Sequence, residues 1–313
     1  MNHSPTNLIE IFLNSEKADG AILQNIFDHY QRVTMSVKAI NENDQHFKTT
    51  DAEACFLDFQ RTWVLGQALK SFLRTKAKKP SKILHMLEAG SGTGIMAIFA
   101  AILNPNIQII CLEINPLSCQ KSQTFIQALK LSNRIKVFNL DATKLDAEQL
   151  PEAKDFDLIF SETLSGGLFF EPQLQITQHI KKFLKTNGFL IPQKIELFLH
   201  LEDPWQKEPL TQKIKYAEID FLNYEKNTIT ADINLGILRS GSPNIVVITS
   251  ELTLTENFKI TTDPKFTNFL NKAIILIPKS QQKIFQINDI VNLQMQYQAG
   301  ANTSSCQIIL RKL

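Results

Sequence analysis

Two glutamates bracket a mostly apolar loop in the middle of the chain. Residues 161–171 read SETLSGGLFFE, so Glu162 and Glu171 stand nine residues apart. Paired carboxylates can hold a cationic nitrogen group through charge-assisted hydrogen bonds, or one of them can act as a general base. The plainer alternative is structural, with Glu162 capping a helix and Glu171 starting the next one ahead of a proline. Residues 162–171 are called the acid loop below.

A glycine-rich loop ends the first predicted strand and opens a helix. Its sequence is LEAGSGTG (87–94). Glycines let a ligand approach the peptide N–H groups of such a loop closely. Gly90 and Gly92 fit the dinucleotide pattern G-x-G-x-x-G, but the third position of that pattern is not glycine and the extra glycine is Gly94. With Glu88 two residues ahead of the first glycine, this spacing favours S-adenosylmethionine as the cofactor.

Polar residues also end the next two predicted strands. Glu113, at the tip of the second strand, can accept both ribose hydroxyls of a nucleotide cofactor. The third strand ends with Asp141, Ala142 and Thr143, which we expect at the adenine edge. Each acid alone could be a helix N-cap, but their order at successive strand ends favours a cofactor site. Arg61, on the helix before the first strand, can pair bidentately with the carboxylate of S-adenosylmethionine.

The elements that position these residues follow from the hydrophobic pattern. Between residues 56 and 201, short apolar strands alternate with amphipathic helices, which predicts a Rossmann-like α/β domain with a mostly parallel sheet. Within it we expect a helix over 171–188 and a last strand over 195–202. Residues 1–55 have helical spacing and predict a helical cap. Residues 202–313 predict an antiparallel, barrel-like β domain, with a hairpin around the turn at QAGAN.

Composition excludes several classes of protein. The 313 residues are 43% hydrophobic and 20% charged, with a net charge of +2, which is typical of a soluble globular protein and disfavours a nucleic-acid coat. The four cysteines and six histidines lack metal-ligand spacing, so we predict no metal, reduced thiols and a cytoplasmic location. No signal peptide or membrane span is expected.

Five blocks in order make the chain resemble the protein arginine methyltransferase family over about residues 45–202. They are His46-Phe47, D-x-x-R-T from Asp58 to Thr62, GSGTGIMAIFAA (90–101), Glu113, and the SE-x(8)-E acid loop with its trailing FLKTNGFLIP (183–192). The resemblance implies a class I S-adenosylmethionine-dependent methyltransferase. It further implies that the two loop acids face the methyl acceptor and that the cofactor is contacted by His46, Arg61, Glu88, Gly90 and Glu113.

The implied chemistry is methylation of a guanidino or similar cationic nitrogen. A guanidinium stays protonated and is a poor nucleophile, because its lone pairs are delocalised. Two carboxylates can hold it bidentately and draw positive charge to one side, so that the opposite nitrogen attacks the sulfonium methyl. Each charge-assisted hydrogen bond contributes roughly 1.5–3 kcal/mol. The acceptor is then a small molecule, a peptide or a protein.

The chain also departs from the family. It contains no Thr-His-Trp sequence, and the nearest counterpart is TNFLN (267–271). The β domain is short, which leaves protein-arginine specificity and a homodimer open. Two alternatives therefore remain: a methyltransferase for an unrelated small acceptor, and a catalytically silent cofactor-binding partner protein. A nucleic-acid amino-methyltransferase is disfavoured, because the fourth strand ends in SETL where such enzymes have Asn/Asp-Pro-Pro-aromatic.

Overall fold

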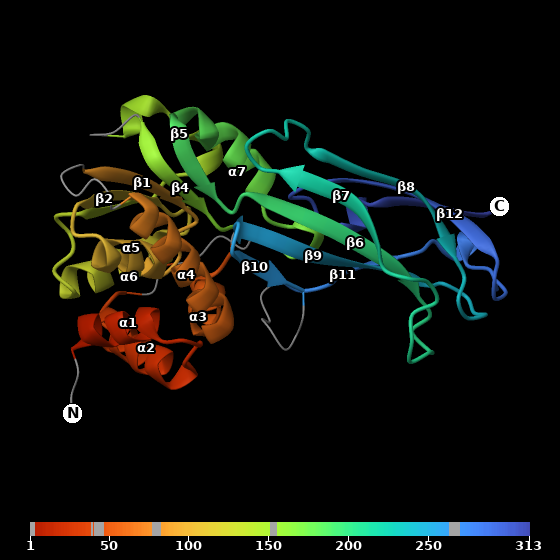
Figure 1. Ribbon diagram of the computed structural model, residues 1–313, viewed down its shortest axis with the longest axis horizontal. Coiled ribbons are helices and arrows are strands. Elements are labelled where there is room, and N and C mark those ends of the chain that lie inside the picture. Colours follow the sequence, from red (N-terminus) through yellow and green to blue (C-terminus); the bar gives the residue numbers. More distant parts are fainter. Residues whose placement is uncertain (1–3, 39, 41–46, 77–82, 151–154, 263–269) are drawn as a thin grey trace. The chain divides into compact units, whose positions relative to one another are not determined.

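The protein is described from a computed structural model (Figure 1). The described residues are 4–38, 40, 47–76, 83–150, 155–262 and 270–313. They form two compact units along the chain. The first unit comprises residues 1–162, 179–192 and 254–260, and the second comprises residues 163–178, 193–253 and 261–313.

The first unit contains a five-stranded parallel sheet with the strand order β3-β2-β1-β4-β5. Its strands are β1 (Leu84–Ala89), β2 (Ile107–Leu112), β3 (Ile135–Phe138), β4 (Phe156–Ser161) and β5 (Leu184–Ile191). Its helices are α1 (Pro5–Asn14), α2 (Gly20–Thr34), α3 (Thr49–Leu57), α4 (Phe59–Lys76), α5 (Ile95–Leu103) and α6 (Pro116–Ala128), while α7 (Gln173–Ile180) spans the division between the units. The prediction of a parallel α/β sheet is confirmed.

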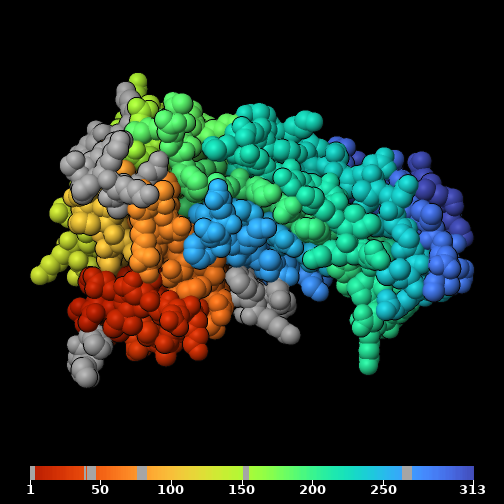
Figure 2. Space-filling model, in the orientation of Figure 1, coloured from red at the N-terminus to blue at the C-terminus, as the bar shows by residue number. Residues whose placement is uncertain are grey.

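The N-terminal helices pack on helices that cover this sheet. The ring of Phe12 in α1 lies 5.9 Å from the ring of Phe99 in α5, measured between centroids. The ring of Tyr30 in α2 meets Phe125 of α6 edge-on at 5.3 Å. Figure 2 shows the red N-terminal residues lying directly against the orange residues of the same unit. These buried aromatic pairs make α1 and α2 part of the first compact unit.

The second unit is built from antiparallel sheets. One sheet has the order β10-β9-β6-β7, with β11 also paired to β9, and the other has the order β13-β12-β8. The strands are β6 (Lys194–Glu202), β7 (Ile214–Asp220), β8 (Thr228–Gly236), β9 (Ile245–Thr255), β10 (Phe258–Thr261), β11 (Ala273–Leu276), β12 (Ile290–Gln298) and β13 (Gln307–Lys312). Residues 254–260, which include the end of β9 and most of β10, are counted with the first unit. The predicted antiparallel β region is confirmed, and so is its last hairpin, in which β12 pairs with β13.

Two predicted elements differ from the structure, one in its sheet and one in its length. The strand expected over 195–202 as the last of the α/β domain is β6, which pairs antiparallel with β7 and β9 in the second unit. The helix expected over 171–188 ends at Ile180, and β5 begins only four residues later, at Leu184. Gly188 suggested the end of a helix, but it lies inside β5, where the pairing with β4 contains a register shift.

Among the described residues, no helix combines the length and the apolar character that crossing a bilayer requires.

Candidate functional site

The glycine loop between β1 and α5 has the backbone that only glycine adopts at low cost. Gly90, Gly92 and Gly94 have φ angles of 74°, 52° and 77°. A Cβ atom added to Gly92 would lie 3.2 Å from the Cβ of Ala52, and one added to Gly94 would lie 3.2 Å from the Cβ of Ser122. The three glycines therefore allow a tight turn from the strand into the helix.

Glu113 follows β2 and holds this glycine loop. One carboxylate oxygen accepts a hydrogen bond from the Gly92 amide at 2.6 Å, and the other accepts from the Asn115 amide at 2.8 Å. The side chain is buried, and burial raises the pKa of Glu113 although these amide bonds oppose the rise. A carboxylate has about four acceptor positions. The Ile114 amide also bonds this carboxylate, so about one acceptor position remains for a ribose hydroxyl of a nucleotide cofactor.

Glu88 lies beneath the loop, inside β1. Its side chain is 2% exposed and accepts hydrogen bonds from the Cys111 thiol, at 3.3 Å, and from the backbone N–H of Ala97 in the first turn of α5. Gly94, the N-cap residue of α5, has no side chain with which to cap the helix. Glu88, in the preceding strand β1, supplies that cap instead. The structure therefore places this expected cofactor contact against the first turn of α5.

The residues after β3 form a short capped turn. The Asp141 carboxylate accepts from the Thr143 amide at 2.9 Å and from the Thr143 hydroxyl at 2.6 Å, at the start of a 3-10 helix from Ala142 to Lys144. Burial tends to raise the pKa of Asp141, but the Thr143 bonds and Lys144 outweigh it, so the pKa is lowered. Asp141 is thus an N-cap here. His46 lies outside the described residues.

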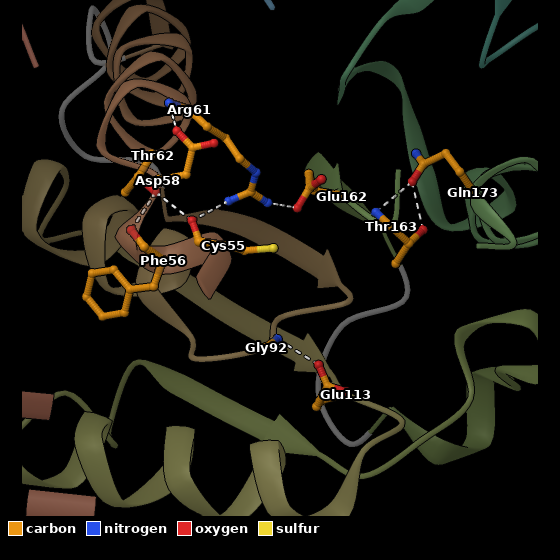
Figure 3. A network of polar contacts seen from close by, with 10 residues as sticks. All are labelled: Cys55, Phe56, Asp58, Arg61, Thr62, Gly92, Glu113, Glu162, Thr163 and Gln173. Atoms are coloured by element: carbon orange, nitrogen blue, oxygen red, sulfur yellow. Dashed lines mark hydrogen bonds and ion pairs between the residues drawn. The ribbon is translucent and has the colours of Figure 1, made fainter. Parts of the chain in front are cut away.

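An ion pair joins two residues for which the sequence suggested separate roles. The Arg61 guanidinium, in the first turn of α4, pairs with the Glu162 carboxylate and also donates to the carbonyl of Cys55 at 3.1 Å (Figure 3). The Arg61 and Glu162 side chains are only 7% and 11% exposed. The Glu162 amide bonds to the Ala89 carbonyl at 3.3 Å, which extends the β1–β4 pairing to the first residue of the acid loop.

A glutamine that the sequence analysis did not single out closes the acid loop. Gln173 is fully buried. Its side-chain oxygen accepts hydrogen bonds from the Thr163 amide at 2.9 Å and from the Thr163 hydroxyl at 2.7 Å (Figure 3). Thr163 follows Glu162 directly, and Gln173 stands two residues after Glu171. The contact therefore joins the second residue of the loop to the start of α7, and both residues lie in the second unit.

The loop between these ends is short and partly helical. Gly166 to Leu168 form a 3-10 turn, and Glu171 precedes α7 by two residues. Of TNFLN, the expected counterpart of the Thr-His-Trp sequence, residues 267–269 lie outside the described part of the chain.

A family model described as "Methyltransferase domain" matches residues 80–240, half of the chain. The chain belongs to this methyltransferase family. The match includes the glycine loop, Glu113 and the whole acid loop, and it confirms the prediction of an S-adenosylmethionine-dependent methyltransferase.

Named relatives of this methyltransferase include arginine methyltransferases. It is 28% identical over 126 residues to "Protein arginine N-methyltransferase 8-B" of Danio rerio, covering 39% of this chain. It is 27% identical over 188 residues to "Histone-arginine methyltransferase CARMER" of Aedes aegypti, covering 59% of this chain. Both matches cover 28% of the relative's own length. The activities and substrates of those whole proteins are therefore not established for this chain.

A solved structure shares the fold. It is the "Trypanosoma brucei PRMT1 enzyme-prozyme heterotetrameric complex with AdoHcy", with a TM-score of 0.61, 14% identity, and coverage of 79% of this chain and 90% of that one. The predicted fold class, a parallel α/β sheet followed by antiparallel sheets, is confirmed by this likeness and by the strand pairing.

Replacing the buried acid under the glycine loop is expected to flatten the pH dependence of stability. Burial raises the pKa of Glu88 from 4.5 to about 8. Between pH 4.5 and about 8, the unfolded chain has released a proton that the folded chain retains. The free energy of unfolding therefore falls, as the pH rises, by up to about 1.4 kcal/mol per pH unit. Glu88→Gln removes that slope. Urea unfolding between about pH 5 and 8 measures the difference.

The exposed acid Glu10, replaced by glutamine, is the control and should keep the wild-type slope. Stability curves of wild type and Glu88→Gln that run parallel over this range would show that Glu88 is already ionised in the folded protein.

Proposed function

We propose that this methyltransferase moves the methyl group of S-adenosylmethionine to a guanidino nitrogen, in a protein or in a small molecule. The observation that carries the proposal is the pairing of Glu162 with the Arg61 guanidinium in a nearly buried position. The first acid of the loop already binds the functional group that the proposed acceptor would present. The relatives named as arginine methyltransferases support the same acceptor chemistry.

The cofactor contacts of this proposal come from the first unit. The glycine loop lets the cofactor approach the backbone, and Glu113 receives the ribose hydroxyls. Arg61 receives the cofactor carboxylate. The remaining proposed contacts are Gly90, Gly92, Gly94, Glu88, Asp141, Ala142, Thr143 and His46. When bound, S-adenosylmethionine supplies a methyl group on a positively charged sulfur, which is a strong electrophile.

The residues of the acid loop act on the acceptor. Glu162 and Glu171 hold the guanidinium by charge-assisted hydrogen bonds and draw its positive charge toward themselves. The nitrogen on the other side would gain electron density and so become a better nucleophile toward the methyl group that the cofactor supplies. The guanidinium proton then leaves to a loop carboxylate or to water. Alignment of nitrogen, carbon and sulfur supplies much of the rate, since the reaction depends mainly on positioning.

Arg61 has two partners in this scheme. Its guanidinium pairs with Glu162 in the structure, and the proposal also assigns to it the carboxylate of the cofactor. A carboxylate that binds Arg61 offsets its positive charge and weakens its hold on Glu162. Cofactor binding would thereby make Glu162 available for the cationic acceptor.

Assembly and location belong to the same proposal. One structural neighbour is titled a heterotetrameric complex, and we propose that this chain also assembles, as a homodimer. The four cysteines are free thiols, in keeping with a cytoplasmic protein.

Weakening either proposed cofactor contact should lower affinity for S-adenosylmethionine. Glu113→Gln removes the charge but keeps one acceptor, and Arg61→Lys keeps the charge but loses the bidentate geometry. Each substitution should raise the dissociation constant by about tenfold or more, since a lost charge-assisted bond costs roughly 1.5–3 kcal/mol. Isothermal titration calorimetry measures this, with Glu10→Gln as the matched surface control. Wild-type affinity in both variants would rule out these two contacts.

Removing the charge of the first loop acid should stop methyl transfer without loss of the cofactor. Glu162→Gln keeps the size and shape of the side chain but cannot balance a guanidinium charge. We expect transfer from labelled S-adenosylmethionine to fall by about a hundredfold or more, as for the loss of a preorganised electrostatic contact. Cofactor affinity should stay within about threefold of wild type, or increase, because Arg61 is less tightly held.

The acceptors for this assay are free arginine, arginine-containing and lysine-containing peptides, histones and cell extract. Glu10→Gln again serves as control. Normal turnover by Glu162→Gln would show that the acid loop does not act by binding a guanidinium. Transfer by the wild type only to a non-guanidino small molecule would favour the alternative, in which the loop acids orient an unrelated acceptor.

A further inference from the structure

The backbone of the acid loop is strained between its two acids. Leu168 and Phe170 have positive φ angles of 62° and 63°, beside Gly167 at 67°. For a residue with a side chain, this left-handed conformation costs roughly 1–2 kcal/mol. Such strain persists only where the surroundings fix it, and it concentrates at functional sites. The contacts that hold this backbone are therefore informative about function.

Tyr297 of β12 contacts the strained segment through both its hydroxyl and its ring. The hydroxyl donates a hydrogen bond to the Gly167 carbonyl at 2.9 Å. The ring stacks on Phe169, with centroids 4.2 Å apart and planes 20° from parallel. Tyr297 is 2% exposed and Phe169 is fully buried. The carbonyl of Phe169 in turn accepts from the Glu171 amide at 2.7 Å, so the contact leads directly to the second acid.

A second tyrosine orients the first. The hydroxyl oxygens of Tyr216, in β7, and Tyr297 lie 2.7 Å apart. Because the Tyr297 hydroxyl donates its proton to the Gly167 carbonyl, Tyr216 is the donor in the bond between the two hydroxyls. Burial is the main cause that raises the pKa of both tyrosines, so both remain neutral donors at physiological pH. The result is a directed chain of hydrogen bonds from Tyr216 through Tyr297 to Gly167.

Backbone contacts enclose the same segment from other sides. The Gly167 amide donates to the Ser250 hydroxyl at 3.3 Å, and the Phe170 amide donates to the Ala301 carbonyl at 3.0 Å. A Cβ atom on Gly166 would clash with the carbonyl oxygen of Asn271, so the loop backbone lies directly against that segment. Residues of the second unit thus hold the backbone of the acid loop from several sides.

We propose that Tyr297 is a positioning residue for methyl transfer, supported by Tyr216. Its hydroxyl fixes the Gly167 peptide, and its ring fixes Phe169, so that Glu171 is presented to the acceptor in one orientation. Tyr297 acts through the loop and does not itself contact the acceptor. The inference rests on the proposed function, because it needs the acid loop to hold the acceptor.

The test removes one hydroxyl and keeps the ring. Tyr297→Phe retains the stack on Phe169 but loses the bond to Gly167. Tyr224→Phe is the matched control, since its hydroxyl bonds the Thr228 carbonyl at 3.2 Å in the same unit and not the carbonyl of Gly167. For each variant we would measure amide hydrogen exchange of the peptide covering residues 163–172, affinity for S-adenosylmethionine, and kcat and KM for an arginine-containing peptide.

In Tyr297→Phe we expect the loop amides to exchange about tenfold faster. The kcat should fall about tenfold or more, as for a slightly misplaced catalytic group, while KM and cofactor affinity change less than about twofold. Tyr216→Phe should shift exchange and kcat in the same direction by less, and Tyr224→Phe should match wild type in both.

Loop exchange in Tyr297→Phe equal to wild type would overturn the proposal, and so would equal loosening in Tyr224→Phe or an unchanged kcat. Hydrogen exchange needs no acceptor, so it decides whether Tyr297 fixes the loop even if no arginine peptide is methylated. Absence of transfer by the wild type would count against the proposed function instead.

Discussion

The nearly buried ion pair between Arg61 and Glu162 is the contact on which the site depends. Two charges in so little solvent are tolerated because each compensates the other, and removing one partner of such a pair costs about 3–5 kcal/mol. The pair fixes the end of β4 to the first turn of α4, and so it sets where the acid loop begins. A ligand carboxylate that bound Arg61 would compete with Glu162 for the same guanidinium, and this would link the binding of that ligand to the state of Glu162.

The parallel sheet explains why these residues meet. β3, β2, β1 and β4 are neighbours, and their carboxyl ends lie along one edge of the sheet. Asp141, Glu113, the glycine loop and Glu162 follow these four strands in that order. A ligand site at this edge is the general rule for open α/β sheets. The second acid, Glu171, belongs to the second unit, where antiparallel strands hold the rest of its loop.

Local patterns made much of this predictable. Three glycines at a strand–helix junction and acids at successive strand ends are short-range signals, and the structure shows the strands they imply. Pairing partners distant in sequence carry no such signal. Arg61 and Glu162 are 101 residues apart, and Gly167 and Tyr297 are 130 apart. β6 was assigned to the wrong sheet because its pairing partners, β7 and β9, lie later in the chain. The capping role of Glu88 was missed, because nothing in the sequence shows that the glycine N-cap of α5 leaves a backbone amide for it to bind.

The central claim is that Glu162 binds a guanidinium in the acceptor as it binds that of Arg61. The most direct test offers the wild-type protein and labelled S-adenosylmethionine two peptides that differ at one residue, arginine or its neutral isostere citrulline. The claim predicts label in the arginine peptide alone, located by fragment-ion mass spectrometry on a terminal guanidino nitrogen. Equal labelling of the citrulline peptide, or a methyl group on any other side chain, would contradict it.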